Sequence, residues 1–250
     1  MMDLRDLRQS VLRSVRDMNK SANDVYYWVA LSTELIQKQP KEFEFSVPSA
    51  KESSKIKIVK RTKDVTKEDM IINIFYSGIT SLVSGVESFL NSIITTLLKY
   101  DTTRLKYTIK GMESDSTISV IDLIDYDKDE LIDRVIGKKV DRLFYSSPSD
   151  YLLYIKKGLG IELKEETWKV WIELKAKRDL IVHNKGVVNT IYQTKIGDSS
   201  NTKIGDKIYC DLESFGKMIS FVKKMVGEIY SVTKKIYNIP SLKKLDDCIN

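Results

Sequence analysis

Two residues able to carry out acid–base and phosphate chemistry lie close together in the sequence. His183 is the only histidine of the 250-residue chain, and Arg178 precedes it by five positions. An imidazole, whose ordinary pKa is about 6.5, can take up or release a proton near neutral pH. A guanidinium can bind one phosphate through paired N–H donors. The pair therefore indicates chemistry on a phosphodiester, with Asp179 and Asn184 as neighbouring polar groups.

The pattern around this pair predicts a helix over residues 164–183. On a helix, residues five apart differ by about 140° in direction and about 7.5 Å along the axis, so Arg178 and His183 can converge on one phosphate only through the long arginine side chain. Asp179, four residues before His183, is placed to accept a hydrogen bond from the imidazole. A structural alternative stays open, in which His183 complements the helix dipole and Arg178 pairs with Glu87.

The residue types also exclude several classes of mechanism. A single histidine cannot form a two-histidine acid–base pair within one chain, a histidine-rich metal site or an HExxH zinc motif. The chain contains no GxxxxGK[ST] loop and no GxSxG motif. Cys210 and Cys248 lack zinc-ligand spacing. We therefore expect no metal and no cofactor.

Composition indicates a mildly basic globular protein. Lys and Arg number 41 against 35 Asp and Glu, for a net charge of +6, with 42% hydrophobic residues. This composition excludes a disordered chain and favours an anionic partner without naming one. The charged N-terminus does not resemble a signal peptide, and the apolar segment 70–100 carries too many polar residues for a comfortable membrane span. We expect a cytoplasmic protein with no membrane contact.

The elements that must position the pair are mostly helices. Apolar periodicity and few prolines or glycines predict a mainly α fold, a helical bundle with a β-hairpin after the motif helix and a small β insertion near the N-terminus. Thr66-x-x-Asp69 resembles a capping box at the start of one helix. The expected helices cover residues 3–19, 21–39, 67–99, 127–145, 148–157, 164–183 and 211–236. The expected strands are 43–47 and 55–63 in the insertion, and 187–195 and 203–210 in the hairpin.

The expected helix 67–99 has two distinct faces. Its apolar face is interrupted at the edge by Glu87, a carboxylate that should have a cationic or hydrogen-bonding partner there. A row of small residues follows the roughly opposite side and permits close approach of neighbouring helices, so this helix is expected between two partners, with one from another subunit as an alternative. The row consists of Ser77, Ser81, Ser84, Ser88 and Ser92.

Basic residues gather at three places that are candidates for RNA binding. The first is an arc of the N-terminal helix, the second is the segment 55–63, and the third is Lys185 beside the histidine. Each has an ordinary structural alternative, a solvated helix face or a lysine-protected edge strand. A nucleic-acid-binding protein that uses these residues is a further hypothesis. The residues are Arg5, Arg8, Arg13 and Arg16, then Lys55, Lys57, Lys60, Arg61 and Lys63, and finally Lys185.

The segment Arg178-Asp-Leu-Ile-Val-His183-Asn-Lys-Gly186 resembles the Arg-x4–6-His motif of the HEPN superfamily. These are small helical domains that include many metal-independent ribonucleases. The resemblance extends over about residues 67–237, through Gly160-Ile-Glu-Leu163, Trp168 and Trp171 and the earlier segment Val86–Leu90. It implies a HEPN-like domain over 66–250, with 1–65 as an accessory region of helices and a small basic β insertion.

The resemblance implies a metal-independent endoribonuclease of a bacterial anti-phage, abortive-infection or toxin–antitoxin system. Attack by the substrate's own 2′-hydroxyl would give 2′,3′-cyclic phosphate and 5′-hydroxyl ends. His183 would act as general acid or base and Arg178 would hold the phosphate. Asp179 and Asn184 would orient these groups, and Glu87 would support Arg178. A homodimer with a composite active-site cleft is implied, together with an antitoxin or regulatory partner.

A second hypothesis within the same resemblance is a non-catalytic module. Such a HEPN-like subunit would serve in dimerisation or partner binding, as an antitoxin-type or nucleotide-binding companion. It predicts a folded dimer without nuclease activity, although the intact Arg178–His183 pair argues against it.

Overall fold

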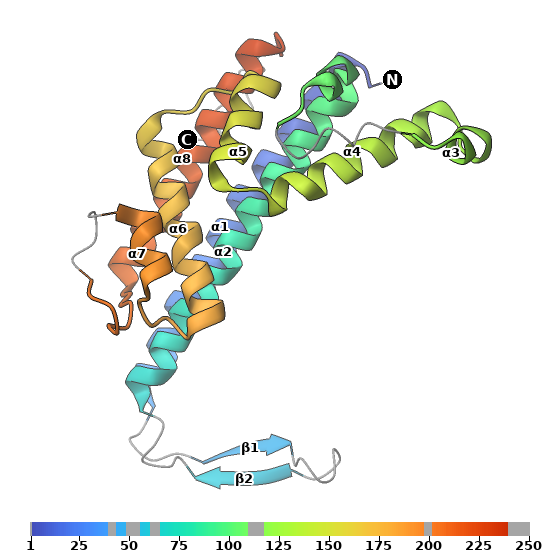
Figure 1. Cartoon of the computed structure of the whole chain (residues 1–250). Coiled ribbons are helices and arrows are strands. Elements are labelled where there is room, and N and C mark those ends of the chain that lie inside the picture. Colours follow the sequence, from blue (N-terminus) through green and yellow to red (C-terminus); the bar gives the residue numbers. More distant parts are fainter. Residues whose placement is uncertain are drawn as a thin grey trace. The chain divides into compact units, whose positions relative to one another are not determined.

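The computed structural model describes residues 2–39, 44–48, 56–60, 66–109, 118–197 and 202–239, with only the backbone described for 44–48 and 56–60. The described chain is mainly helical (Figure 1). The helices are α1 (Leu4–Lys38), α2 (Lys67–Tyr100), α3 (Val120–Asp125), α4 (Lys128–Tyr145), α5 (Pro148–Leu153), α6 (Glu165–Asn184), α7 (Thr190–Ile196) and α8 (Leu212–Ile236). Thr102–Lys106 forms a 3-10 turn and Tyr154–Gly158 a π turn.

The chain divides into two compact units, each made of separate stretches of the sequence. Unit 1 contains residues 1–22, 83–175 and 220–250, and unit 2 contains residues 23–82 and 176–219. Helices α1, α2, α6 and α8 each contribute residues to both units. The N-terminal helix is therefore part of both cores.

Local signals set most helix ends at the predicted positions. Thr66 and Asp69 form the capping box predicted for α2, with the Asp69 N–H 3.1 Å from Thr66 Oγ1 and the Thr66 N–H 3.1 Å from Asp69 Oδ2. Asp127 and Glu130 form the same arrangement at α4. The predicted helices over 67–99, 127–145, 164–183 and 211–236 are confirmed within two residues at each end.

The prediction of two N-terminal helices is wrong, because α1 runs without interruption from Leu4 to Lys38. No glycine or proline occurs between these residues, so nothing in the backbone ends the helix near residue 20. Met18 and Ala22 are both buried and carry the apolar face across the predicted gap.

The β-hairpin predicted after α6 is also wrong in its first arm, where residues 190–196 form α7. The only remnant of pairing in the described part of this region is an isolated antiparallel bridge between Val187 and Lys207. Tyr192 and Ile196 lie four residues apart on α7 and pack into one hydrophobic cluster, a spacing that favours a helix over an extended strand.

At the position of the predicted insertion, Glu44–Pro48 (β1) and Ile56–Lys60 (β2) pair antiparallel, with Glu44 opposite Lys60 and Pro48 opposite Ile56. The two strands therefore form a short two-stranded antiparallel sheet.

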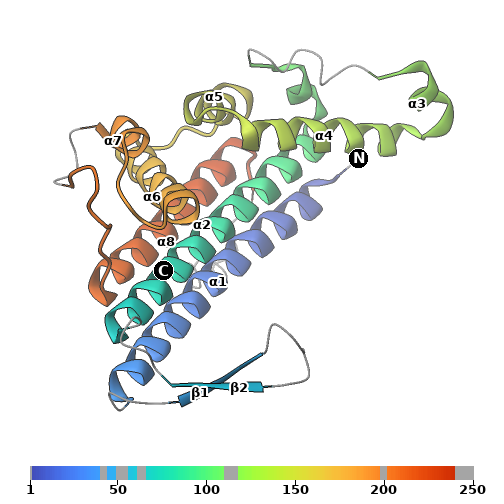
Figure 2. The same ribbon diagram turned by 60° about the horizontal axis from the view of Figure 1, so that its bottom comes forward.

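Helix α2 lies between α1 and α8 (Figure 2), but all five serines of the predicted row are exposed, so the row is not buried between these helices. In unit 2, a Cβ added to Gly78 of α2 would lie 2.5 Å from Val29 of α1 and 3.0 Å from Phe215 of α8. In unit 1, Ser92 of α2 shares a hydrogen bond of 2.7 Å with Ser14 of α1. The absence of a side chain at Gly78 therefore lets the three helices pack closely in unit 2.

Helix α2 is the one helix in the described residues that is long and apolar enough to cross a membrane by length and composition. Of its most apolar 18-residue window, 56% is buried inside the protein. That degree of burial agrees with the core helix expected from the sequence.

Candidate active site at the end of α6

The first turns of α6 are fixed within unit 1. Glu228 of α8 accepts a hydrogen bond of 2.8 Å from the Lys164 N–H and one of 2.7 Å from the Thr167 hydroxyl. Trp168 stacks on Tyr151 with ring centroids 6.0 Å apart, and Trp171 is buried. The two tryptophans are therefore core residues of this helix.

The last turns of α6 are held in unit 2 by a buried cluster. Ala176 and Leu180 of α6 pack with Tyr76, Val188 and Tyr192. Tyr76 also donates a hydrogen bond of 2.9 Å to the carbonyl of Ile208. This packing fixes the helical turn from which Arg178, Asp179 and His183 project.

Asn184 closes the turn that ends α6. Its side-chain amide donates to the carbonyl of Val187, and the Val187 N–H donates back to the Asn184 carbonyl at 2.9 Å. Lys185 and Gly186 then take left-handed backbone conformations, with φ of 53° and 75°. The structure thus places Asn184 in support of the backbone beside His183.

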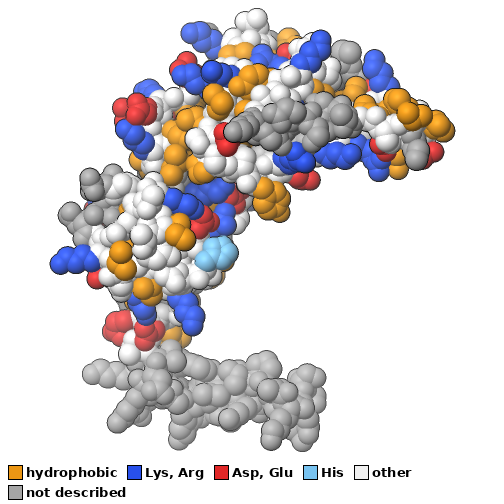
Figure 3. All heavy atoms as spheres, viewed as in Figure 1, with side chains coloured by type: hydrophobic (Ala, Val, Ile, Leu, Met, Phe, Trp, Pro, Cys, Tyr) orange, Lys and Arg blue, Asp and Glu red, His pale blue; other side chains and the backbone are white. Residues whose placement is uncertain are grey.

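The side chain of His183 is exposed in the last turn of α6, and the histidine is visible at the surface in Figure 3. Within the described part of the chain, its imidazole takes part in no hydrogen bond or ion pair. It is therefore accessible to a substrate from solvent.

Asp179 brings two cations together on the same helical turn. Arg178 Nη1 lies 3.3 Å from Asp179 Oδ1, and Lys195 Nζ from α7 lies 3.1 Å from Asp179 Oδ2. The structure therefore directs this carboxylate at Arg178 and Lys195, where the sequence predicted a bond to His183. The side chains of Arg178 and Asp179 retain 21% and 30% of their exposure, so the cluster is shielded yet reachable.

Lys195 is a site residue that sequence reasoning missed. The interpretation of 187–195 as a strand gave it no defined relation to Asp179. The spacing of Tyr192 and Ile196 was the available signal, because on a helix it places Lys195 beside the buried face.

Glu87 has the cationic partner that its position required. Lys175 Nζ lies 3.1 Å from Glu87 Oε1, with side chains 29% and 21% exposed, and both residues belong to unit 1. Burial, followed by the charge of Glu87, raises the pKa of Tyr151. Arg178 belongs to unit 2, so its support by Glu87 stays a prediction.

The candidate RNA-binding residues do not all fall within the described structure. Side chains of Arg5, Arg13, Arg16 and Lys185 are exposed, and Arg8 is half-buried. Lys57 and Lys60 lie on β2, where only the backbone is described, and Lys55, Arg61 and Lys63 lie outside the described residues.

The described residues contain no group of three or more His, Cys, Asp and Glu side chains placed to hold a metal ion. Cys210 is a free, buried thiol, and burial raises its pKa to about 11. Cys248 lies outside the described residues.

Comparisons with known proteins find no similar protein. No protein-family model matches the sequence. Searches of the curated proteins and of the solved structures find no match either. The functional interpretation therefore rests on the residues at the end of α6 and on the sequence resemblance of their motif.

Proposed function

We propose that this protein is a metal-independent endoribonuclease of the HEPN type, with His183 and Arg178 as its catalytic residues. The observation that supports the proposal most directly is the exposed imidazole of His183 on the same helix end as the Arg178–Asp179–Lys195 charge cluster. An accessible proton-transfer group beside fixed cations is what cleavage of a phosphodiester requires.

In the proposed reaction, the 2′-oxygen of the RNA attacks the adjacent phosphorus and the bond from phosphorus to the 5′-oxygen breaks. One imidazole takes the proton of the 2′-hydroxyl, and a protonated group supplies one to the leaving 5′-oxygen. Arg178 offsets the charge that develops on the phosphate. A homodimer would bring two copies of His183 to one cleft and so provide both proton-transfer groups.

Asp179 acts in this scheme as a positioning residue. Its carboxylate contacts the guanidinium of Arg178 on one oxygen and the ammonium of Lys195 on the other. A carboxylate shared by two cations restricts their rotamers, so both can face a phosphate without being neutralised completely. Asn184 contributes by fixing the turn that follows His183.

The biological setting that fits this chemistry is a cytoplasmic bacterial anti-phage, abortive-infection or toxin–antitoxin system. A nuclease that damages cellular RNA needs a regulator, and an antitoxin or other partner protein would supply it. The resemblance of the Arg178–His183 motif supports this setting.

The first experiment is induced expression in a bacterial host of the wild type, Arg178→Ala and His183→Ala, with growth and total RNA integrity followed together. Lys169→Ala is the matched control, because Lys169 is an exposed residue of α6 paired with Glu165 at 2.8 Å. We expect growth arrest and RNA breakage with the wild type and Lys169→Ala only.

Purified proteins then test the chemistry on a synthetic RNA. Cleavage that survives EDTA, leaves 2′,3′-cyclic phosphate ends and stops at a 2′-deoxy substitution is the expected result. Cleavage that EDTA abolishes, or full activity of His183→Ala, would overturn the proposal. Soluble wild-type dimers without cleavage would favour the non-catalytic module.

A further inference from the structure

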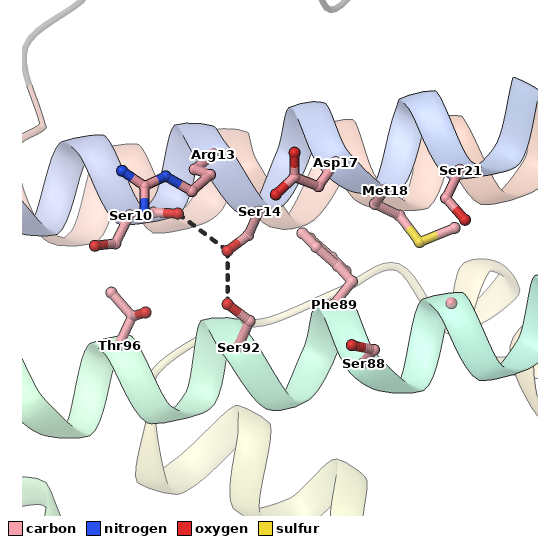
Figure 4. Close-up of a pocket in the computed structure, with 11 residues that line it drawn as sticks. Ser10, Arg13, Ser14, Asp17, Met18, Ser21, Ser88, Phe89, Ser92 and Thr96 are labelled. Atoms are coloured by element: carbon pink, nitrogen blue, oxygen red, sulfur yellow. Dashed lines mark hydrogen bonds between the residues drawn. The ribbon is translucent and has the colours of Figure 1, made fainter.

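A groove in unit 1 is lined by hydroxyl groups from two helices (Figure 4). It lies between residues 10–21 of α1 and residues 85–96 of α2 and has a volume of about 410 Å³. Sites for small molecules commonly measure about 300–1,000 Å³, so a nucleotide-sized ligand fits this space. We refer to it as the hydroxyl groove.

Serine hydroxyls of α1 and α2 face one another across the groove. The Ser14 hydroxyl donates to the carbonyl of Ser10 at 3.0 Å and shares a hydrogen bond of 2.7 Å with Ser92. Ser88 lines the same wall as Ser92, and the buried ring of Phe89 lies between the helices. The lining thus combines short polar groups with one aromatic surface, as sites for polyhydroxylated ligands do.

The side chain of Thr96 is a second observation, separate from the serines, that favours a ligand in this groove. Its side chain is directed from α2 toward α1 and lines the groove, although the residue is only 7% exposed. Within the described residues, its hydroxyl makes no hydrogen bond. The hydroxyl oxygen itself is accessible from the groove, so a ligand there can hydrogen-bond to it without moving the side chain.

The rim of the groove carries one basic and one acidic side chain, Arg13 and Asp17, which in the described structure form no ion pair with each other. Arg13 and Asp17 are exposed, line the groove and lie four residues apart on α1, a spacing at which such residues commonly pair. The described part of the structure contains no ion pair between them or with another residue. A guanidinium suits a phosphate, and a carboxylate suits the two hydroxyls of a ribose.

We propose that the hydroxyl groove binds the ribose 5′-phosphate part of a ribonucleotide. Arg13, Ser10 and Thr96 gather at one end of the groove and hold the phosphate, and Asp17, further along, accepts the 2′- and 3′-hydroxyls. A free nucleotide and the 3′-terminal nucleotide of an RNA both present this chemistry. The groove shares no residue with the candidate active site, so the two proposals stand or fall separately.

The test is calorimetric titration of the full chain carrying His183→Ala, a substitution that prevents cleavage of the RNA probes if the proposed nuclease activity is correct. The probes are AMP, its 2′-deoxy form, and a short RNA ending in either a 3′-hydroxyl or a 3′-phosphate. We expect saturable one-site binding of a ligand with a free diol, and affinity at least about tenfold lower for the deoxy or 3′-phosphate form. Binding of AMP identifies a free nucleotide, and binding of the 3′-hydroxyl RNA alone identifies an RNA end.

Two variants locate the binding in the groove. Asp17→Asn and Thr96→Val are each expected to weaken it about tenfold or more, because each removes a hydrogen bond to the ligand. Asp6→Asn on α1 and Thr95→Val on α2 are the matched controls. Thr95 bonds to Asn91 at 3.2 Å, and neither control residue lines the groove.

The proposal is overturned if no probe binds at millimolar concentration, if the diol makes no difference, or if both groove variants bind as the controls do. Thr96→Val should keep its melting temperature, because the hydroxyl it removes has no partner in the described residues. If this variant fails to fold, the binding measured with Asp17→Asn, whose side chain is at the exposed rim, is sufficient to test the proposal.

Discussion

The hydroxyl of Tyr76 occupies the space in which a side chain on Gly186 would begin. A Cβ built on Gly186 would lie 2.2 Å from Tyr76 Oη. The same hydroxyl donates to the Ile208 carbonyl at 2.9 Å, and the Ile208 N–H donates to the Gly186 carbonyl at 2.9 Å. Tyr76 therefore joins the end of α6 to the segment 205–208 through one contact that requires glycine.

Gly186→Ala is expected to lower the free energy of unfolding by about 2–4 kcal/mol, from left-handed backbone strain together with displacement of Tyr76. Urea denaturation measures this as a lower midpoint at unchanged slope. Gly205→Ala is the control, because Gly205 also has a positive φ, 94°, but an added Cβ there meets nothing within 4 Å. Equal losses in the two variants would show that the Tyr76 contact does not matter.

Local chemistry explains why several elements could be predicted from the sequence. The Thr66–Asp69 capping box and the apolar spacing of α2, α4 and α8 need only neighbouring residues to specify a helix. The partner of Glu87 could be anticipated in kind, because a carboxylate at the edge of an apolar face requires one. Its identity as Lys175 depends on how α6 packs in unit 1.

The candidate site was predicted only in part, because part of it depends on α7. The sequence of residues 187–195 fits an alternating strand equally well, and the packing of Tyr192 and Ile196 into one cluster favours a helix. That helix carries Lys195 to Asp179, a contact between residues 16 apart that no local pattern encodes. The hydroxyl groove escaped prediction for the same reason, because α1 and α2 together form it.

The pH at which the Cys210 thiol ionises tests whether this residue is buried in the folded protein. Burial raises its pKa to about 11, against an ordinary thiol value of about 8.5. Between these values the unfolded thiol loses its proton and the folded one keeps it, so this contribution to stability is complete below about pH 8.5 and is lost as the pH rises toward 11. Thiolate absorbance of Cys248→Ser, folded and in urea, measures both pKa values.

The folded Cys248→Ser protein should show half-ionisation near pH 11, and the unfolded protein should show it at about pH 8.5. Ionisation of the folded thiol at the pH found in urea would contradict the buried position of Cys210. A variant that also carries Cys210→Ser gives the background absorbance of the tyrosines.

Glu87 can be tested for two separate roles. Its ion pair with Lys175 is mostly shielded from solvent, so a double-mutant cycle with Glu87→Gln and Lys175→Met should give a coupling energy of about 0.5–1.5 kcal/mol. If Glu87 also supports Arg178, Glu87→Gln will lower RNA cleavage about tenfold or more, while Lys175→Met will leave it within about twofold. Equal activity in both variants would confine Glu87 to a structural role.

Lys195 is expected to act on RNA cleavage through Asp179. Lys195→Met removes one of the two cations beside that carboxylate, so Asp179 will bind Arg178 more tightly and hold it away from a phosphate. We expect kcat to fall about tenfold with little change in KM, and Lys195→Arg to restore most of it. The melting temperature should hardly change, because the Lys195 side chain is 39% exposed and such ion pairs contribute little to stability. A loss that Lys195→Arg fails to restore, or one that follows the melting temperature, would show that Lys195 only holds α7 in place.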